Sequence, residues 1–192
     1  EYSIRTRESA ERLIAIVNDL LDVARIQSGK LSVRNENVDV SKIITKVIEE
    51  LSISGQEKSI ALTSDGTEIE HFAIADPKRF HQALTNLVSN AIKYTKEGTI
   101  TIAVNDKRET VEIRVKDTGM GISSDDQKQL FAPFFRVQNA DVSKITGTGL
   151  GMWITKQLVE LMGGKVAVES IKGVGTHIAI TLPKDSNKST KL

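Results

Sequence analysis

Two adjacent segments alternate strictly between apolar and polar residues, and this alternation limits the chain to folds built on a sheet. They are GTITIAVND at residues 98–106 and ETVEIRVKD at residues 109–117. Because successive side chains of a strand point to opposite faces, each segment predicts a strand with one apolar face. The short polar turn at residues 105–109 predicts that the two strands form a hairpin.

Two amphipathic helices are predicted before this hairpin in the sequence. The first covers residues 37–52, with Asp39 or Ser41 as its N-cap. A second begins after Asp76, which serves as its N-cap, and carries Pro77 at the first helical position, where the missing N–H costs nothing.

The remaining elements complete an α+β arrangement. With 192 residues, 39% of them apolar, the chain can form one domain with a real core plus an appendage. Its element order favours a mixed sheet with helices packed on one face. The other expected elements are strands near residues 60–62 and 72–74, a third helix at 148–162, and a final hairpin at 165–170 and 176–183.

The first segment of the chain differs from the rest, because its apolar residues form two stripes on one long helix. Gly29 is its expected end. Two stripes favour a bundle-forming helix that pairs with its own copy or with a helix absent from this chain, and a core helix of the main domain is the alternative. The first stripe runs from Leu13 through Val17, Leu20, Ala24, Gln27 and Leu31, and the second consists of Ile14 and Leu21.

Charge and composition exclude several classes of function. A net charge of +1 gives no field that would attract nucleic acid, and the absence of cysteine excludes disulfides and thiolate metal sites. No apolar run is long enough to cross a bilayer and no signal peptide opens the sequence, so we expect a soluble piece. It starts without methionine, which predicts a fragment of a longer protein. The tail at residues 184–192 is expected to be disordered.

Chemistry first appears on the second helix, where Asn86, Asn90 and Lys93 are spaced four and three residues apart beside Tyr94. An asparagine carbonyl oxygen is a hard ligand suited to Mg²⁺, and a neighbouring lysine suits the phosphates that the ion bridges. The alternative is a solvated helix face that carries two amides.

Three glycine clusters follow in the sequence. Asp117 ends a predicted strand beside Gly119 and Gly121, where it could accept a hydrogen bond from an exocyclic amine such as that of adenine. GTGLG at residues 147–151 opens the third helix and offers N–H groups and a positive dipole end to phosphate. GVGT at residues 173–176 precedes the last strand. Each cluster is also compatible with an ordinary turn.

In combination, these motifs resemble a known family. TNLVSNAIKYT, DTGMGI, FAPFFR, GTGLGMWI and GVGTHIAITLP occur in the order found in the ATP-binding domain of sensor histidine kinases, which has the Bergerat fold shared with gyrase, heat-shock chaperones and mismatch-repair ATPases. SAERLIAIVNDLLDVARIQSGKL resembles the second helix of the family's dimerisation and phosphotransfer hairpin. The resemblance divides the chain into that helix at residues 1–31, a catalytic ATP-binding domain at 32–183 and a tail at 184–192.

The resemblance implies ATP and Mg²⁺ as cofactors and assigns catalytic roles on the second helix. Asn90 would ligate Mg²⁺, Asn86 would support the same face, Lys93 would meet the phosphates and Tyr94 would line the nucleotide site.

For the adenine base, the resemblance implies that Asp117 binds the amine, supported through water by Thr176. Gly119 and Gly121 would let the base lie against the backbone. Residues 122–146 would form a mobile lid. The other residues implied at the nucleotide site are Ile122, Phe135, Arg136, Gly147, Thr148, Gly149, Leu150 and Gly151.

One part of the family pattern is absent, because His71, His81 and His177 all lie outside any acceptor motif. The resemblance therefore implies a kinase core that transfers the γ-phosphate to a histidine on a helix missing from this chain, for relay to a response regulator receiver domain. It further implies a homodimer formed through the N-terminal helix, no nucleic-acid partner and a cytoplasmic location in a parent that could be membrane-anchored.

Two other classes of function stay open at this stage. A Bergerat-type ATPase clamp would need a catalytic glutamate four residues before Asn90, where this chain has Asn86. A regulatory nucleotide-binding module would keep every binding residue and transfer nothing.

Overall fold

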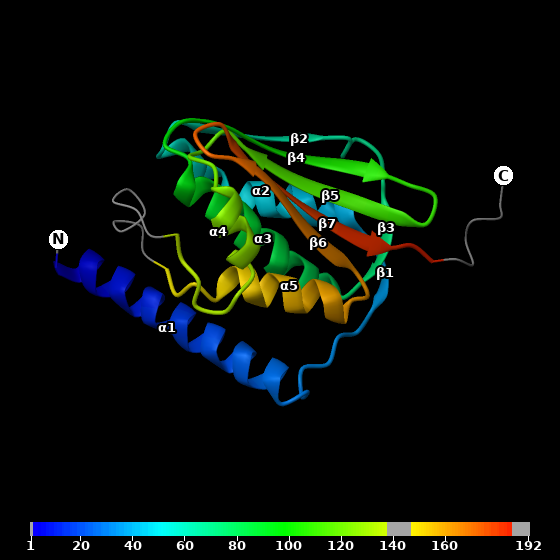
Figure 1. The fold of residues 1–192 in the computed structure, drawn as a ribbon, viewed down its shortest axis with the longest axis horizontal. Helices are drawn as coiled ribbons and strands as arrows, with labels where there is room; N and C mark the ends of the chain where they lie inside the picture. The colour runs from blue at the N-terminus through cyan, green and yellow to red at the C-terminus, as the bar shows by residue number, and fades with distance from the viewer. Residues whose placement is uncertain (1, 138–146, 186–192) are drawn as a thin grey trace.

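A five-stranded mixed sheet forms one layer of the molecule in a computed structural model that describes residues 2–137 and 147–185 (Figure 1). Its strands follow the order β2-β4-β5-β7-β6, with β2 parallel to β4 and the other neighbours antiparallel. The strands are β2 (Ile60–Asp65), β4 (Gly98–Asp106), β5 (Thr110–Asp117), β6 (Lys165–Ile171) and β7 (Gly175–Pro183).

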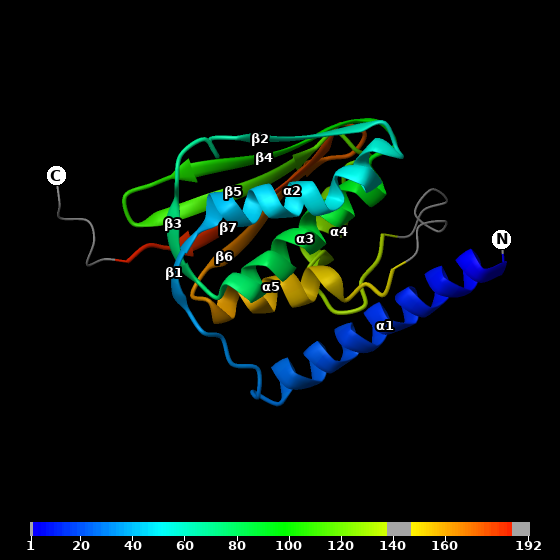
Figure 2. The same cartoon turned by 180° about the vertical axis from the view of Figure 1, so that it is seen from behind.

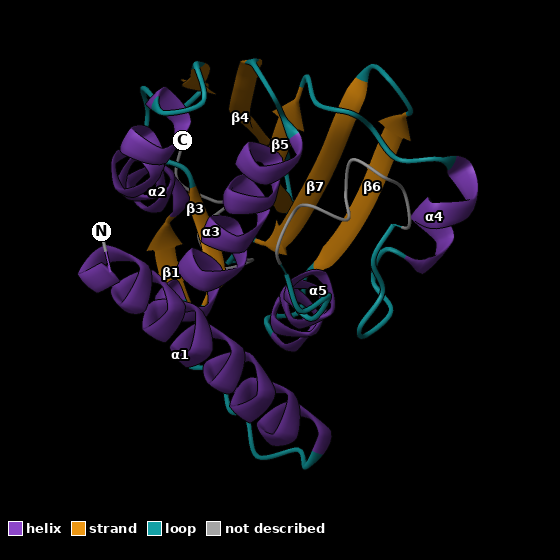
Figure 3. Cartoon of the chain, turned by 90° about the vertical axis from the view of Figure 1, so that its left-hand side faces the viewer, coloured by secondary structure: helices purple, strands orange, loops and turns teal. Residues whose placement is uncertain are grey.

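Helices α2 (Val40–Gln56), α3 (Pro77–Tyr94) and α5 (Gly151–Leu161) form the second layer and cover one face of this sheet (Figure 3). The core lies between the layers, where Phe80 and Leu84 of α3 pack in the same cluster as Ile102 of β4. The predicted fold class, a mixed sheet with helices on one face, is confirmed.

Local signals explain where α2 and α3 begin. Asp39 caps α2 by accepting a hydrogen bond from the Ser41 backbone nitrogen at 3.0 Å. Asp76 caps α3 through the backbone nitrogens of Lys78 and Arg79, with Pro77 at the start of the helix. Both ends therefore follow from capping chemistry visible in the sequence.

Three elements differ from the sequence prediction. The four-residue strand β1 (Glu36–Asp39) pairs with β3 (Phe72–Ala75) in a separate two-stranded sheet. A short helix, α4 (Ser124–Gln129), occupies part of the expected lid, whose residues 138–146 lie outside the described residues, as does the tail from 186. Helix α5 starts at Gly151 rather than near Thr148, because Gly149 adopts a φ of 75° that cannot belong to an α-helix.

Helix α1 (Tyr2–Gln27) runs alongside α5 on the side away from the sheet (Figures 1 and 2). It ends just before Gly29, as predicted, and none of its described side chains belongs to the main core. A smaller cluster joins it to α5 through Val23, Leu31, Leu150, Ile154 and Leu158.

Polar contacts also hold α1 against α3. Asp22 accepts a hydrogen bond from Gln82 Nε2 at 2.7 Å and lies 3.6 Å from Arg79. A different face of α1 stays exposed, and we call it the apolar stripe; its members, 48–64% exposed, are Leu13, Ile14, Val17, Leu20 and Leu21. Over the described residues, no helix combines the length and the apolar character needed to cross a membrane.

Candidate functional site

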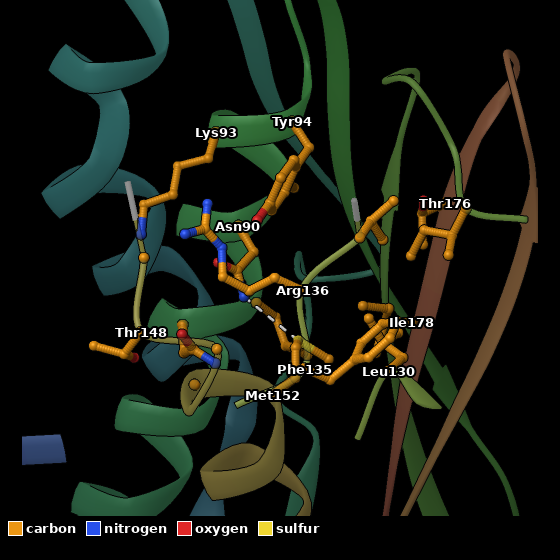
Figure 4. Close-up of a pocket in the computed structure, with 18 of the residues that line it drawn as sticks. Asn90, Lys93, Tyr94, Leu130, Phe135, Arg136, Thr148, Met152, Thr176 and Ile178 are labelled. Atoms are coloured by element: carbon orange, nitrogen blue, oxygen red, sulfur yellow. Dashed lines mark hydrogen bonds between the residues drawn. The ribbon is translucent and has the colours of Figure 1, made fainter. Parts of the chain in front are cut away.

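A cavity of about 470 Å³ opens between α3, the sheet, α1 and the segment that leads into α5 (Figure 4). Lys93 and Thr148 lie on one side of it, and Thr176 and Ile178 of β7 lie on the other. We call these the α3 side and the sheet side. The cavity therefore brings together residues that are more than 80 positions apart in the sequence.

Two asparagine side chains of α3, Asn86 and Asn90, line the α3 side of the cavity. Asn86 Nδ2 donates to Thr155 Oγ1 at 2.7 Å, and Asn90 Nδ2 contacts Met152 Sδ at 3.4 Å. Both amide nitrogens are therefore held by α5. Neither amide oxygen forms a hydrogen bond with any residue in the described part of the chain, so both oxygens remain as acceptors for a ligand.

Charges of both signs face the α3 side of the cavity. Thr148 donates its hydroxyl hydrogen to Asp19 Oδ2 at 3.1 Å, and burial raises the pKa of the Asp19 carboxyl above its ordinary value. Much of the Lys93 side chain is exposed, but desolvation of its ammonium group lowers its pKa. The nearby Asp19 carboxylate partly offsets this lowering. Shifted pKa values in a cavity are typical of functional sites.

The start of α5 adds backbone N–H groups to the cavity. Its N-cap, Leu150, makes no side-chain capping bond, and Thr148 Oγ1 accepts from the Leu150 backbone nitrogen at 3.2 Å. The first N–H groups of a helix lack intrahelical partners, and they carry the positive end of the helix dipole. This end of α5 is consequently suited to an anion.

On the sheet side, Asp117 is the last residue of β5 and only 8% exposed. Its Oδ1 accepts hydrogen bonds from the backbone nitrogens of Gly119, at 2.9 Å, and Thr176, at 3.2 Å. Burial nevertheless raises the pKa of the Asp117 carboxyl, because these two bonds only partly replace its hydration. Its Oδ2 receives no hydrogen bond from the residues that the structure describes, and a ligand N–H would supply one.

The glycines beside Asp117 are required by the packing of the protein itself. A Cβ on Gly119 would lie 2.6 Å from the Tyr94 carbonyl oxygen, and one on Gly121, at a φ of 64°, would overlap the Ile171 carbonyl oxygen. The expectation that both glycines make room for a flat ligand differs from this geometry, since Gly119 does not line the cavity.

Most of the other predicted site residues do line the cavity. Leu150 does not, because its side chain is buried in the cluster between α1 and α5. The predicted residues on the wall are Asn86, Asn90, Lys93, Tyr94, Asp117, Gly121, Ile122, Phe135, Arg136, Gly147, Thr148, Gly149, Gly151 and Thr176.

Sequence reasoning missed the contribution of α1. Ala15, Ile16 and Asp19 line the cavity from this helix. The only signal was an acidic pair, Asp19 and Asp22, one turn apart on a helix whose neighbouring residues are apolar, and acids on a helix are usually read as solvent-facing. The apolar wall residues Leu130, Met152 and Ile178 carried no chemical signal at all.

Comparison with known proteins agrees with this geometry. Residues 75–186 match the family described as histidine kinase-, DNA gyrase B-, and HSP90-like ATPase. The chain is 38% identical over 192 residues to the sensor protein GacS of Pseudomonas syringae pv. syringae and 34% identical over 181 residues to the sensor histidine kinase WalK of Bacillus subtilis (strain 168). These alignments cover 96% and 93% of this chain but only 21% and 30% of the two relatives.

A solved structure shows the same fold. The crystal structure of full-length ShkA in complex with AMPPNP has a TM-score of 0.82 and 29% identity, and the match covers 95% of this chain and 38% of that one. The family match spans more than half of the chain, from the cap of α3 through β7. The chain therefore belongs to the histidine kinase-, DNA gyrase B- and HSP90-like ATPase family.

Proposed function

We propose that this chain is the ATP-binding catalytic core of a sensor histidine kinase, which transfers the γ-phosphate of Mg·ATP to a histidine on another helix. The observation that carries the proposal is the polarity of the cavity. Asp117, a buried carboxylate with one oxygen that no described residue contacts, lies on the sheet side. Lys93, Thr148 and the start of α5 lie on the α3 side. An amine-bearing base joined to a phosphate chain matches both.

On the sheet side, Asp117 Oδ2 accepts from the adenine amine. Burial raises the pKa of this carboxyl, because the ionised group loses hydration that its two backbone hydrogen bonds only partly replace. The adenine amine would supply a further hydrogen bond, to Oδ2. Val115, Ile178 and Leu130 provide an apolar surface for the ring. Base recognition then depends on one carboxylate oxygen and on shape.

On the α3 side, Lys93, Thr148 and the open N–H groups of α5 bind the phosphates. The Asn90 oxygen suits Mg²⁺, because its amide nitrogen is already engaged by Met152 and a carbonyl oxygen is a hard ligand. Mg²⁺, when bound, neutralises charge on the triphosphate. Among the described residues, no group of three or more His, Cys, Asp or Glu side chains is placed to hold a metal ion. The protein ligand in this proposal is the Asn90 amide oxygen.

The transfer step forms a bond between an imidazole nitrogen and the γ-phosphorus and breaks the bond from that phosphorus to the β,γ-bridging oxygen, which leaves with ADP. A neutral imidazole already carries the attacking lone pair, so catalysis rests on positioning and charge neutralisation. No histidine is among the cavity-lining residues that the structure describes. His71, for example, is 6% exposed and contacts Asp106 and the Gly66 carbonyl oxygen.

The acceptor helix would pack against the apolar stripe of α1, which no described residue covers. In this proposal residues 1–31 are half of a dimerisation and phosphotransfer hairpin, residues 32–183 are the catalytic domain and residues 184–192 are a tail. The partners are a second copy of the parent protein and a response regulator receiver domain.

Incubation with γ-labelled ATP tests the proposal. A polypeptide that carries the family's acceptor helix should acquire acid-labile, alkali-stable label, as a phosphohistidine does, and the chain alone should acquire none. Acid-stable label on the chain alone would contradict the proposal. Phosphate release without transfer would favour an ATPase clamp, and nucleotide binding with neither product would favour a regulatory module.

A further inference from the structure

Ser170, on the edge strand β6, lies beside the sheet side of the cavity without lining it. Its hydroxyl oxygen has three close polar neighbours. The Ile122 backbone nitrogen lies at 2.8 Å, the Gly175 carbonyl oxygen at 2.9 Å and the Thr176 hydroxyl at 3.0 Å. Of these residues, Ile122 and Thr176 themselves line the cavity.

Only one placement of the hydrogens makes all three contacts hydrogen bonds at the same time. A serine hydroxyl has one hydrogen to donate and two lone pairs to accept with. The Gly175 carbonyl oxygen can only accept, so it takes the Ser170 hydrogen. The Ile122 N–H can only donate, so it occupies one lone pair. The Thr176 hydroxyl must therefore donate its hydrogen to the second lone pair.

This arrangement determines what Thr176 offers the cavity. Its hydroxyl hydrogen is held by Ser170, and its backbone N–H is held by Asp117 Oδ1 at 3.2 Å. Only the lone pairs of its hydroxyl oxygen remain for a ligand. Beside it, Asp117 Oδ2 is also an acceptor. The groups that Asp117 and Thr176 leave for direct contact with a ligand are thus both acceptors.

Ser170 is itself held in place by a hydrogen bond from helix α4. Gln127 of α4 donates through Nε2 to the carbonyl oxygens of Ser170 and Ile122, both at 2.9 Å. These bonds hold the start of the segment 122–129 against β6. The Ser170 hydroxyl cannot turn away without losing bonds to Ile122 and Gly175, so the orientation of the Thr176 hydroxyl is stable.

We propose that Ser170 is a specificity-determining positioning residue, which keeps Thr176 as a hydrogen-bond acceptor and so selects 6-amino over 6-oxo purine nucleotides. At position 6, a 6-amino purine presents an N–H donor to these acceptors, whereas guanine or hypoxanthine would place a carbonyl oxygen, itself an acceptor, against them. The inference rests on the proposed nucleotide-binding function and adds a residue that does not touch the base.

Calorimetric titration of the 192-residue chain with Mg·ATP and with Mg·GTP tests this inference. Ser170→Ala removes the acceptor for the Thr176 hydrogen, and the freed hydroxyl can then turn and donate to a 6-carbonyl. The ratio of GTP to ATP dissociation constants should fall about three- to tenfold, which corresponds to one neutral hydrogen bond. Ser170→Thr keeps the hydroxyl and should keep the wild-type ratio.

A double-mutant cycle separates positioning from a structural role. In a Thr176→Val background the rotating hydroxyl is gone, so Ser170→Ala should leave the GTP-to-ATP ratio unchanged. Equal weakening of both nucleotides by Ser170→Ala, or an unchanged ratio, would overturn the inference while leaving the proposed function intact. If Ser170→Ala does not fold, a changed ratio in Ser170→Thr would overturn it and an unchanged one would support it. A wild-type chain that binds neither nucleotide would overturn the proposed function and this inference with it.

Discussion

Replacing Asp117 with asparagine should weaken ATP binding without weakening the fold. Oδ1 of Asp117 accepts from two backbone N–H groups, so an asparagine must place its own oxygen there to avoid facing donors with a donor. Its NH₂ group then replaces Oδ2 and faces the adenine amine. Loss of a hydrogen bond to a charged group costs about 1.5–3 kcal/mol, roughly tenfold to over a hundredfold in affinity.

The stability of the variant follows from the sign of the pKa shift. Burial raises the pKa of the Asp117 carboxyl in the folded chain, so the folded state holds its proton more tightly than the unfolded state. The stability contributed by this group is complete below the unfolded pKa and is lost as the pH rises through the folded one. Near neutral pH, Asp117→Asn should melt at the wild-type temperature or above it.

Calorimetric titration with Mg·ATP and thermal melting monitored by circular dichroism measure the two effects. Asp125→Asn is a matched control, since it makes the same chemical change at a side chain that is 86% exposed and outside the cavity. It should change neither measurement. An Asp117→Asn variant that binds ATP as tightly as the wild type would refute the role of Asp117, and one that melts well below it would refute the hydrogen-bond argument.

Four further results are expected. Asn90→Ala should lose the Mg²⁺-dependent part of nucleotide affinity with an unchanged circular-dichroism spectrum, and equal losses with and without Mg²⁺ would contradict a metal role. The affinity for Mg·ATP should fall as the pH drops toward the raised pKa of Asp117, since protonation replaces an acceptor with a donor, and the Asp117→Asn variant titrated in parallel should lack that loss. Joint replacement of Leu20 and Leu21 by glutamate should abolish label transfer to an added acceptor helix at unchanged ATP affinity, because neither residue lines the cavity; undiminished transfer would count against docking on α1. Asp19→Asn should raise the affinity for Mg·ATP more than for adenosine in the same titration, since it removes a negative charge from the α3 side; equal changes would place the phosphates elsewhere.

The fold was readable from the sequence where local chemistry decides it. Alternation in β4 and β5 and the Asp76–Pro77 cap of α3 each have a local cause, and each appears in the structure as predicted. Strand β1 was not predicted, because four residues are too few to show an alternating pattern. The parallel pairing of β2 with β4 depends on a partner more than 30 residues away, which no local pattern encodes.

For the site, spacing on one helix was the strongest guide. Asn86, Asn90 and Lys93 share a face whatever the rest of the chain does, so their meeting in the cavity could be predicted. The position of Asp19 could not, because it depends on how α1 docks on a domain that follows it in the chain. Ser170 was missed for a different reason: a serine on an edge strand acquires a role only when its three polar neighbours are known.

The hydroxyl hydrogen of Thr148 can bind either to α1 or to a ligand in the cavity, but not to both. The Thr148 hydroxyl donates to Asp19 Oδ2 and accepts from the Leu150 backbone nitrogen, so its one hydrogen is already committed to α1. A phosphate that binds this hydroxyl must take the hydrogen from Asp19, which releases one of the polar contacts of α1 and leaves those of Asp22 in place. The two events are therefore linked with a coupling on the order of one charge-assisted hydrogen bond, about 1.5–3 kcal/mol, and linkage is reciprocal. A partner that draws α1 away from the domain would strengthen phosphate binding by the same factor by which nucleotide loosens α1.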